Sequence, residues 1–274
     1  MAIEIHITDH NLQALRHAKI SETATVARLI PALVTQLELP TTDPSGRPVT
    51  YHLSHGERQL EEDQTLTSAG VQSGDTLTIV PEMTAGIGFG ICAALSAEEP
   101  PILAMSEAAE CRPRSGFPSF AGISVEDRQV RLYVHEQALG EIREHSITSC
   151  DREVGGILTG EVYEEDGKYV VLIESICRAR HVRSSPVSLQ FTAETWIDIL
   201  KSRHTEPQKR SLGWYHSHPG IGVFLSGIDE FTHQSFFSSQ PWYVAVVIDP
   251  ISGEFGAFTW EHGRLCRCTQ IGTL

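Results

Sequence analysis

The sequence is short of positive charge and has no long hydrophobic run. Its 274 residues carry 21 Lys and Arg against 35 Asp and Glu, which gives a formal net charge of −14. Nucleic-acid-binding proteins normally show a basic patch or stripe, so this charge balance argues against that class. The longest weakly apolar run, residues 85–95, is about half the length that crosses a bilayer. The N-terminus also lacks the apolar core of a signal peptide. The charge balance therefore leads us to expect no nucleic-acid partner, and the lack of long apolar runs leads us to expect no membrane partner.

The six cysteines show no disulfide framework. They are Cys92, Cys111, Cys150, Cys177, Cys266 and Cys268, and their spacing follows no regular pattern. Cys266 and Cys268 could form half of a metal site, but the sequence contains no second pair to complete it. We therefore expect free thiols in a reducing cytoplasm.

The most informative stretch is residues 216–229, which read HSHPGIGVFLSGID. His216 and His218 stand at i and i+2 after an apolar run, so on a strand both imidazoles point to one face. Pro219 and the following glycine end that strand. Asp229 comes where a helix can begin, and its carboxylate can act as a third ligand. Two His, one carboxylate and a fourth position open to water describe a catalytic zinc site.

Each part of this pattern also has a simpler interpretation. A single His-x-His on an apolar strand is often incidental. The spacing of Ser226 and Asp229 is close to that of a helix capping box. The metal interpretation is favoured because both pairs occur in one short window, separated by a turn. A hydrolytic site also needs a base, and Glu153 is the best candidate, since it precedes two glycines and an apolar strand.

Glu153 with its GILTG strand, then HSHP, Ser226 and Asp229 resemble the signature of the JAMM (MPN-plus, JAB) metalloproteases. The resemblance covers roughly residues 122–269. It implies that His216, His218 and Asp229 bind Zn²⁺ and that Glu153 is the general base and proton shuttle. It further implies that Ser226 helps to hold the tetrahedral oxyanion.

Residues 1–83 form a separate pattern. Ile3, Ile5 and Ile7 alternate as in a half-buried strand, and residues 12–20 can return as its hairpin partner. Thr25 can cap a helix that contains Pro31, and short strands near residues 51–53 and 59–60 follow. An apolar strand over residues 76–80 closes the segment. This order resembles a β-grasp, ubiquitin-like domain, most closely the bacterial ubiquitin-like branch.

We therefore expect an α+β chain in which a β-grasp ubiquitin-like domain (residues 1–83) is joined to a C-terminal α/β JAB/MPN metalloprotease domain (residues 122–274). Residues 84–121 are rich in Gly, Pro and Ser without a sustained period, and they are interpreted as a flexible linker. In the second domain we expect strands near residues 130–134, 154–160, 169–174, 243–248 and 254–260, and helices near 135–145, 192–200 and 230–237.

The resemblance implies an enzyme that cleaves after the C-terminal glycine of a ubiquitin-like modifier, in deconjugation or precursor maturation. Its implied partners are a ubiquitin-like protein or its conjugates, including its own N-terminal domain, and bacterial E1- and E2-like conjugation enzymes. Two alternatives stay open. The chain could mature a β-grasp sulfur carrier, or it could be a non-catalytic MPN scaffold, which zinc analysis would reveal.

The linker contains a candidate cleavage site. In ubiquitin-like modifiers the terminal glycine lies about ten residues beyond the residue that opens the last strand, and enzymes of this type hold such tails as an added strand. Counting from Thr76 predicts an end at Gly86, with Ile87 as the first residue of the released fragment. Gly88 and Gly90 are rival positions, and a plain hinge is the alternative to cleavage.

Overall fold

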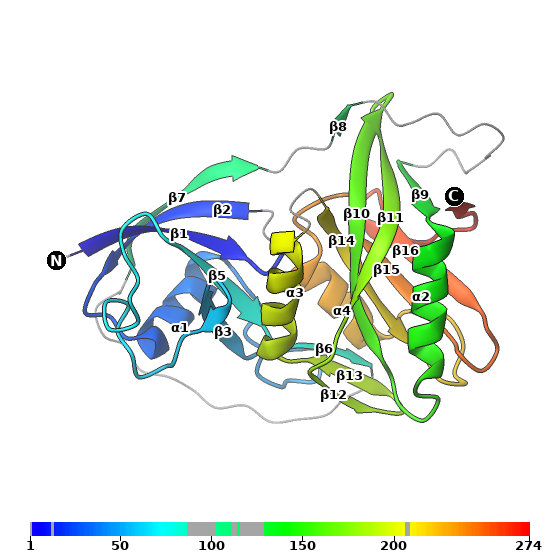
Figure 1. Ribbon diagram of the computed structural model, residues 1–274, viewed down its shortest axis with the longest axis horizontal. Coiled ribbons are helices and arrows are strands. Elements are labelled where there is room, and N and C mark those ends of the chain that lie inside the picture. The colour runs from blue at the N-terminus through cyan, green and yellow to red at the C-terminus, as the bar shows by residue number, and fades with distance from the viewer. Residues whose placement is uncertain (1, 12–13, 87–101, 111–113, 116–128, 206–208) are drawn as a thin grey trace. The chain divides into compact units, whose positions relative to one another are not determined.

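The structure is a computed structural model that describes residues 2–11, 14–86, 102–110, 114–115, 129–205 and 209–274 (Figure 1). It consists of two compact units. The first unit takes the described residues among 1–83, 88–111 and 192–201. The second unit contains the described residues among 84–87, 112–191 and 202–274. Residues 84–86, which directly follow Met83 of the first unit, therefore belong to the second unit.

The first unit is a mixed sheet with one helix. The sheet has the strand order β4-β3-β5-β1-β2-β7. Its members are β1 (Ala2–Asp9), β2 (Ala14–Ser21), β3 (Tyr51–His55), β4 (Arg58–Gln59), β5 (Thr76–Pro81) and β7 (Ile102–Glu110). The strands β1 and β5 are parallel, whereas β1–β2 and β3–β5 are antiparallel. A hairpin, a helix and a last strand that returns beside the first form the ubiquitin-like arrangement that the sequence predicts.

Helix α1 (Val26–Gln36) follows Thr25, which occupies the N-cap position without a side-chain hydrogen bond. Its apolar residues recur at helical spacing, and Val26, Leu29 and Leu33 are fully buried. Pro31 lies inside the helix, as predicted, and the helix continues past it.

The second unit is organised around a long sheet with the order β17-β16-β15-β14-β10-β11-β9-β18, with β8 paired to β10. The strands are β8 (Arg114–Ser115), β9 (Val130–Val134), β10 (Gly155–Glu165), β11 (Lys168–Arg178), β14 (Arg210–Ser217), β15 (Val244–Ile248), β16 (Phe255–Glu261), β17 (Arg264–Arg267) and β18 (Gly272–Thr273). The predicted pairing of the Glu153 strand with residues 169–174 is confirmed. All of β15 and nearly all of β14 are buried, so these strands form the centre of the unit.

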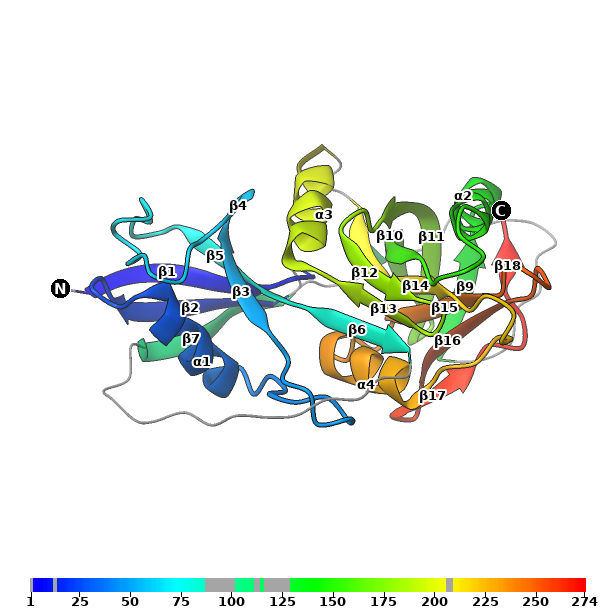
Figure 2. The same ribbon diagram turned by 90° about the horizontal axis from the view of Figure 1, so that it is seen from below.

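Helices α2 (Glu136–Ile147) and α4 (Gly227–Phe236) cover opposite faces of this sheet (Figure 2). Neighbouring residues on β14 show why. The Trp214 indole donates to His233 of α4 at 3.1 Å, while the Tyr215 hydroxyl bonds His145 of α2 at 2.8 Å. Successive side chains of a strand point to opposite faces. His216, two residues after Trp214, therefore faces α4.

A second, three-stranded sheet has the order β12-β13-β6. It combines the hairpin of β12 (Val182–Ser185) and β13 (Ser188–Phe191) with β6 (Met83–Gly86). Helix α3 (Ala193–Thr205) begins after Thr192, as predicted.

Part of the range 84–121 differs from the predicted flexible linker. Residues of β6, β7 and β8 lie within it, and β7 pairs with β2 over residues 102–110. The prediction was wrong for these residues because their pairing partners are far away in sequence and therefore leave no local pattern. The domain boundaries themselves stay a prediction.

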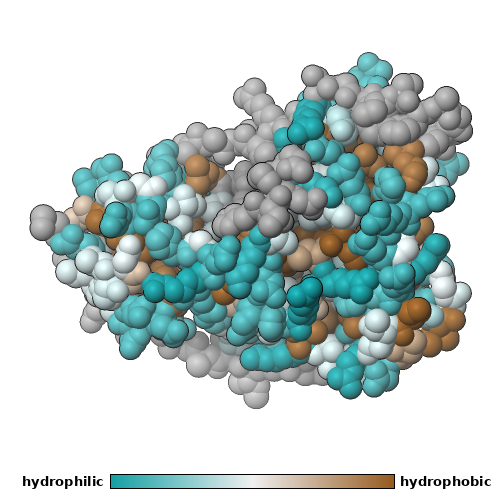
Figure 3. All heavy atoms as spheres, in the orientation of Figure 1, coloured by the Kyte–Doolittle hydropathy of each residue, from teal (hydrophilic) through white to brown (hydrophobic). Residues whose placement is uncertain are grey.

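The surface of the described residues is largely polar in the view of Figure 3, in keeping with the composition. None of the helices in the described ranges has the length and apolarity needed to span a membrane. Four cysteines fall within the described residues, and none of them, Cys150, Cys177, Cys266 or Cys268, is in a disulfide there.

Candidate metal centre

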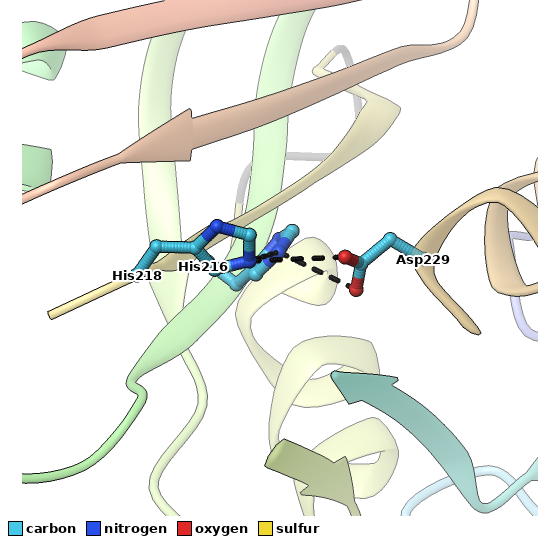
Figure 4. A group of neighbouring side chains, drawn as sticks. All are labelled: His216, His218 and Asp229. Carbon is cyan, nitrogen blue, oxygen red and sulfur yellow. Dashed lines mark hydrogen bonds and ion pairs between the residues drawn. The ribbon is translucent and has the colours of Figure 1, made fainter. Parts of the chain in front are cut away.

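Three side chains converge at the end of β14. The Nε2 atoms of His216 and His218 lie 3.0 Å apart, and Asp229 places one carboxylate oxygen 3.4 Å and the other 3.7 Å from them (Figure 4). One ligand atom from each residue falls within a single 4.8 Å cluster. All three side chains are buried, with 0%, 1% and 0% exposure. The structure thus brings together the three residues that the sequence nominates as metal ligands.

The charge and hydrogen bonds of these three side chains suit the binding of a cation. His218 Nδ1 lies 3.1 Å from the Gly222 carbonyl oxygen, which can only accept, so Nδ1 donates this hydrogen bond. The other ring nitrogen of His218, Nε2, lies 3.7 Å from Asp229 Oδ2. Burial lowers the pKa of His216, which is therefore neutral. Burial alone would raise the pKa of Asp229, but His216 and hydrogen bonds hold it well below its usual range. Two imidazoles and an ionised carboxylate are a donor set that binds Zn²⁺.

Asp229 is oriented by the start of its own helix. Ser226 is the N-cap of α4, and its Oγ accepts from the Asp229 backbone amide at 3.2 Å. Asp229 Oδ2 accepts in return from the Ser226 amide at 2.7 Å. The capping-box interpretation is thus confirmed, and it coexists with the ligand position because the second carboxylate oxygen remains directed at His216.

His216 is held by aromatic neighbours that sequence reasoning missed. Its ring stacks on Trp214, with centroids 4.6 Å apart and planes 10° from parallel. Trp214 is fixed in turn by its hydrogen bond to His233, whose pKa burial lowers to about 3 and which is therefore a neutral acceptor. The i, i+2 spacing of Trp214 and His216 on a strand is the signal that could have predicted this contact.

Glu153 is buried at 0% exposure, and neither of its carboxylate oxygens has a hydrogen-bond partner among the described residues. Burial first, and the charge of Asp229 second, raise its pKa to about 9. Two hydrogen bonds from backbone amides hold the Glu153 segment in place. The Glu153 amide donates to the Ser185 carbonyl at 2.9 Å, and the next amide, that of Val154, donates to Ser217 Oγ at 2.9 Å. Ser217 lies between the two histidines in sequence, so the hydrogen bond from Val154 to Ser217 fixes the Glu153 backbone relative to them.

Gly155 and Gly156 allow β10 and β14 to approach each other closely. A Cβ at Gly155 would meet the Tyr215 carbonyl and lie 2.7 Å from a Leu189 methyl group. A Cβ at Gly156 would meet the Cys177 carbonyl and lie 2.8 Å from the Tyr215 ring. The expectation that two glycines permit close approach after Glu153 is therefore confirmed at both positions.

The loop after His218 is organised by Asp249, which the sequence analysis did not nominate. Its carboxylate accepts from the amides of Gly220 at 3.0 Å and Gly222 at 3.2 Å. These bonds position the Gly222 carbonyl that accepts from His218 Nδ1. Asp249 directly follows β15, beside the end of β14, and only the strand pairing reveals that proximity.

The structure describes only one of the two candidate cleavage residues. Gly86 is the last residue of β6, whereas Ile87, Gly88 and Gly90 lie outside the described residues. Both Gly86 and Ile87 therefore stay a prediction.

Two protein families match the chain. Residues 128–241 match the JAB1/Mov34/MPN/PAD-1 ubiquitin protease family, over the span that contains the three candidate ligands and Glu153. Residues 128–241 form a JAB domain. Residues 4–79 match the YukD protein of the WXG100 secretion system, over the ubiquitin-like sheet of the first unit. The chain is therefore a JAB-domain protein with an N-terminal ubiquitin-like domain.

Curated relatives are similar to the JAB-domain half. The 26S proteasome non-ATPase regulatory subunit 14 of Drosophila melanogaster is 33% identical over 154 residues, or 56% of this chain and 48% of the relative. The ubiquitin carboxyl-terminal hydrolase RPN11 of Saccharomyces cerevisiae is 32% identical over 141 residues, or 51% of this chain and 45% of the relative. The chain thus spans about half the length of these relatives.

Proposed function

We propose that this chain is a Zn²⁺-dependent peptidase or isopeptidase of the JAMM type that cleaves after the C-terminal glycine of a ubiquitin-like modifier. The observation that carries the proposal is Glu153, a fully buried carboxyl group whose oxygens have no hydrogen-bond partner among the described residues and whose pKa the charge of Asp229 in the buried His-His-Asp cluster helps to raise. Such a group costs stability, on the order of 1–3 kcal/mol for an unsatisfied buried polar atom. A scaffold gains nothing from it, so the arrangement favours catalysis over the non-catalytic alternative.

His216, His218 and Asp229 would hold the metal ion. Zn²⁺ bound there would polarise the scissile carbonyl and make the attacking water more acidic. Glu153, whose pKa of about 9 in the metal-free site the nearby cation would lower, would take the proton from the water and return it to the leaving amine, which is general base followed by general acid catalysis. Its burial excludes other proton acceptors, so the proton stays available for the leaving group.

Ser226 has a hydroxyl suited to the developing oxyanion. Its oxygen already accepts from the Asp229 amide, which fixes the side chain beside the ligands. The hydroxyl hydrogen can therefore be donated to an oxyanion, and donors set in place before the reaction contribute large electrostatic stabilisation. This role rests on the capping geometry together with the family resemblance.

Several features support a ubiquitin-like substrate. The ubiquitin-like domain, the match to a ubiquitin protease family and the relative named a ubiquitin carboxyl-terminal hydrolase point to the same class. We further propose that the chain works with E1- and E2-like conjugation enzymes. The four cysteines among the described residues are in no disulfide, which would suit a reducing compartment such as the cytoplasm.

Reporter hydrolysis tests the proposal. Ubiquitin and a peptide of the sequence Glu82–Gly86, each ending in a glycine amide of aminocoumarin, would be incubated with the zinc-loaded chain and with Glu153→Gln. We expect turnover that Glu153→Gln lowers by about 10²–10⁴-fold while zinc content by elemental analysis is unchanged. Turnover of either reporter that does not depend on Glu153 contradicts the assignment, and so does a chain that retains no zinc.

A further inference from the structure

The strand β6 belongs structurally to the JAB-domain unit, although it directly follows the ubiquitin-like sequence. Residues 84–86 cluster with the second unit, and β6 joins the β12–β13 hairpin as its third strand, next to β13 (Figure 2). Backbone pairing with a sheet edge is the way many proteins bind an extended peptide. The edge of β13 is therefore occupied by a segment of the same chain.

Helix α4 holds β6 from another side. The Thr232 hydroxyl donates a hydrogen bond to the Thr84 carbonyl. Thr232 is three residues after Asp229, so the two share one helix face about 4.5 Å apart along the axis. Ala85 is fully buried. One face of α4 thus offers both a metal ligand and an anchor for this strand.

The hairpin that carries β6 also positions Glu153. The Ser185 carbonyl at the end of β12 accepts the Glu153 amide, and Leu189 of β13 packs over Gly155. In Figure 4 the teal arrow of β6 enters from the side of α4, with its C-terminal end towards the ligand cluster. The platform that binds β6 is therefore continuous with the candidate base.

We propose that β6 is the chain's own substrate tail and that the JAB domain cleaves its own Gly86–Ile87 bond in cis. This inference rests on the proposed function. Gly86 lies two residues beyond Thr84, about 7 Å along an extended strand, and Thr84 is hydrogen-bonded to the helix that carries Asp229. Thr84, Ala85 and Gly86 are all small residues, like the glycine-ended tail that the proposed function requires.

The reaction is a hydrolysis and needs no further reactant. The oxygen of one water molecule bonds to the Gly86 carbonyl carbon, and the bond from that carbon to the Ile87 nitrogen breaks. Glu153 moves the proton from the water to the Ile87 amine. The products are a ubiquitin-like fragment with a free Gly86 carboxylate and a JAB-domain fragment that begins at Ile87.

A plain hinge accounts less well for these contacts. A hinge needs neither a place in a sheet, nor a hydrogen bond from the helix that carries Asp229, nor a fully buried Ala85. Ordering an extended segment costs roughly 1–2 kcal/mol of backbone entropy per residue, and the pairing with β13, the Thr232 hydrogen bond and the burial of Ala85 offset that cost.

Intact mass spectrometry tests the inference on the full chain, with wild type and Ala85→Pro each incubated with zinc and with the Glu82–Gly86 reporter. Proline removes a strand amide, so Ala85→Pro should release β6 from the edge of β13 without altering the ligands or Glu153. We expect wild type to yield fragments ending at Gly86 and starting at Ile87, with a rate constant unchanged over a hundredfold dilution. Ala85→Pro should cleave itself at least tenfold more slowly while it hydrolyses the reporter.

The outcomes separate the two proposals. If either chain hydrolyses the reporter but wild type stays intact, or is cut after Gly88 or Gly90, the inference is overturned and the proposed function stands. If neither chain hydrolyses the reporter, the proposed function fails.

Amide hydrogen exchange of the zinc-free Glu153→Gln variant tests whether β6 is held in place, without relying on catalysis. The amides of residues 84–86 should be protected at least tenfold more than in the same chain with Thr232→Val added, which removes the hydroxyl anchor. Thr232→Ser is the matched control and should keep the protection. Equal and rapid exchange in all three chains overturns the inference.

Discussion

Ser226 and Asp229 hold each other through reciprocal hydrogen bonds, 3.2 Å from the Asp229 amide to Ser226 Oγ and 2.7 Å from the Ser226 amide to Asp229 Oδ2. Asp229 therefore takes part in the cap of helix α4 and is also a candidate metal ligand. Ser226→Ala should remove half of the cap and lower the free energy of unfolding by about 1 kcal/mol. It should also weaken zinc binding, because Asp229 loses its fixed orientation. Chemical denaturation and competition with a zinc chelator measure the two effects.

Ser226→Thr is the control for this prediction, because threonine also caps helices. It should keep both stability and zinc affinity near the wild-type values. If Ser226→Ala binds zinc as tightly as Ser226→Thr does, the cap does not orient the ligand.

Trp214 and Tyr215 offer a matched pair of substitutions on opposite faces of β14. Trp214→Phe removes the N–H that bonds His233 and shrinks the ring that stacks on His216. Tyr215→Phe removes the hydroxyl that bonds His145 on the other face. Trp214→Phe should cost about 1–3 kcal/mol of stability, since it leaves the buried His233 unsatisfied, and Tyr215→Phe should cost less, since His145 is only half-buried. Only Trp214→Phe should weaken zinc affinity, which calorimetric titration would measure, and equal affinities would contradict the positioning role of Trp214.

Zinc removal should lower the melting temperature of the JAB-domain unit. A ligand that binds only the folded state at a hundred times its Kd stabilises by about 2.7 kcal/mol. For a unit of this size that corresponds to a fall of about 5–10 °C when a chelator is added. Asp229→Asn is the matched variant, because asparagine keeps the capping acceptor but not the charge. Its melting temperature should not respond to zinc, and a response equal to that of wild type would exclude Asp229 as a ligand.

The local parts of the site could be predicted from sequence, whereas its supporting contacts could not. His216, His218 and Asp229 lie within fourteen residues, so strand and helix periodicity suffice to place them near one another. Asp249 and Ser185 reach the site only through strand pairing, which leaves no mark at their own positions. The ubiquitin-like order of elements was predictable for the same local reason.

The strand β6 shows the limit most clearly. Residues 83–86 pair with a hairpin about one hundred residues later in the chain. Their composition of small residues beside several glycines indicates a linker, because strand formation there depends on the partner edge and not on intrinsic propensity. Segments that form a strand only by adding to another sheet are therefore poorly visible in a single sequence.

Glu153 makes the stability of the zinc-free protein depend on pH. Its pKa in the folded protein is raised to about 9 from an ordinary 4.5. Between these values the unfolded chain has released the proton that the folded chain still holds. The folded state therefore loses stability as pH rises, by about 1.4 kcal/mol per pH unit for this one group, until the pH passes the folded pKa.

Glu153→Gln keeps the shape of this side chain and removes its titration. Between pH 7 and 9, zinc-free Glu153→Gln should therefore become progressively more stable than wild type. Burial lowers the pKa values of His145 and His233 to about 4 and about 3, so both are neutral throughout this window and do not contribute to the slope. Urea denaturation at intervals of half a pH unit measures the difference. A difference between the two proteins that stays constant from pH 7 to 9 would show that Glu153 is already ionised at neutral pH.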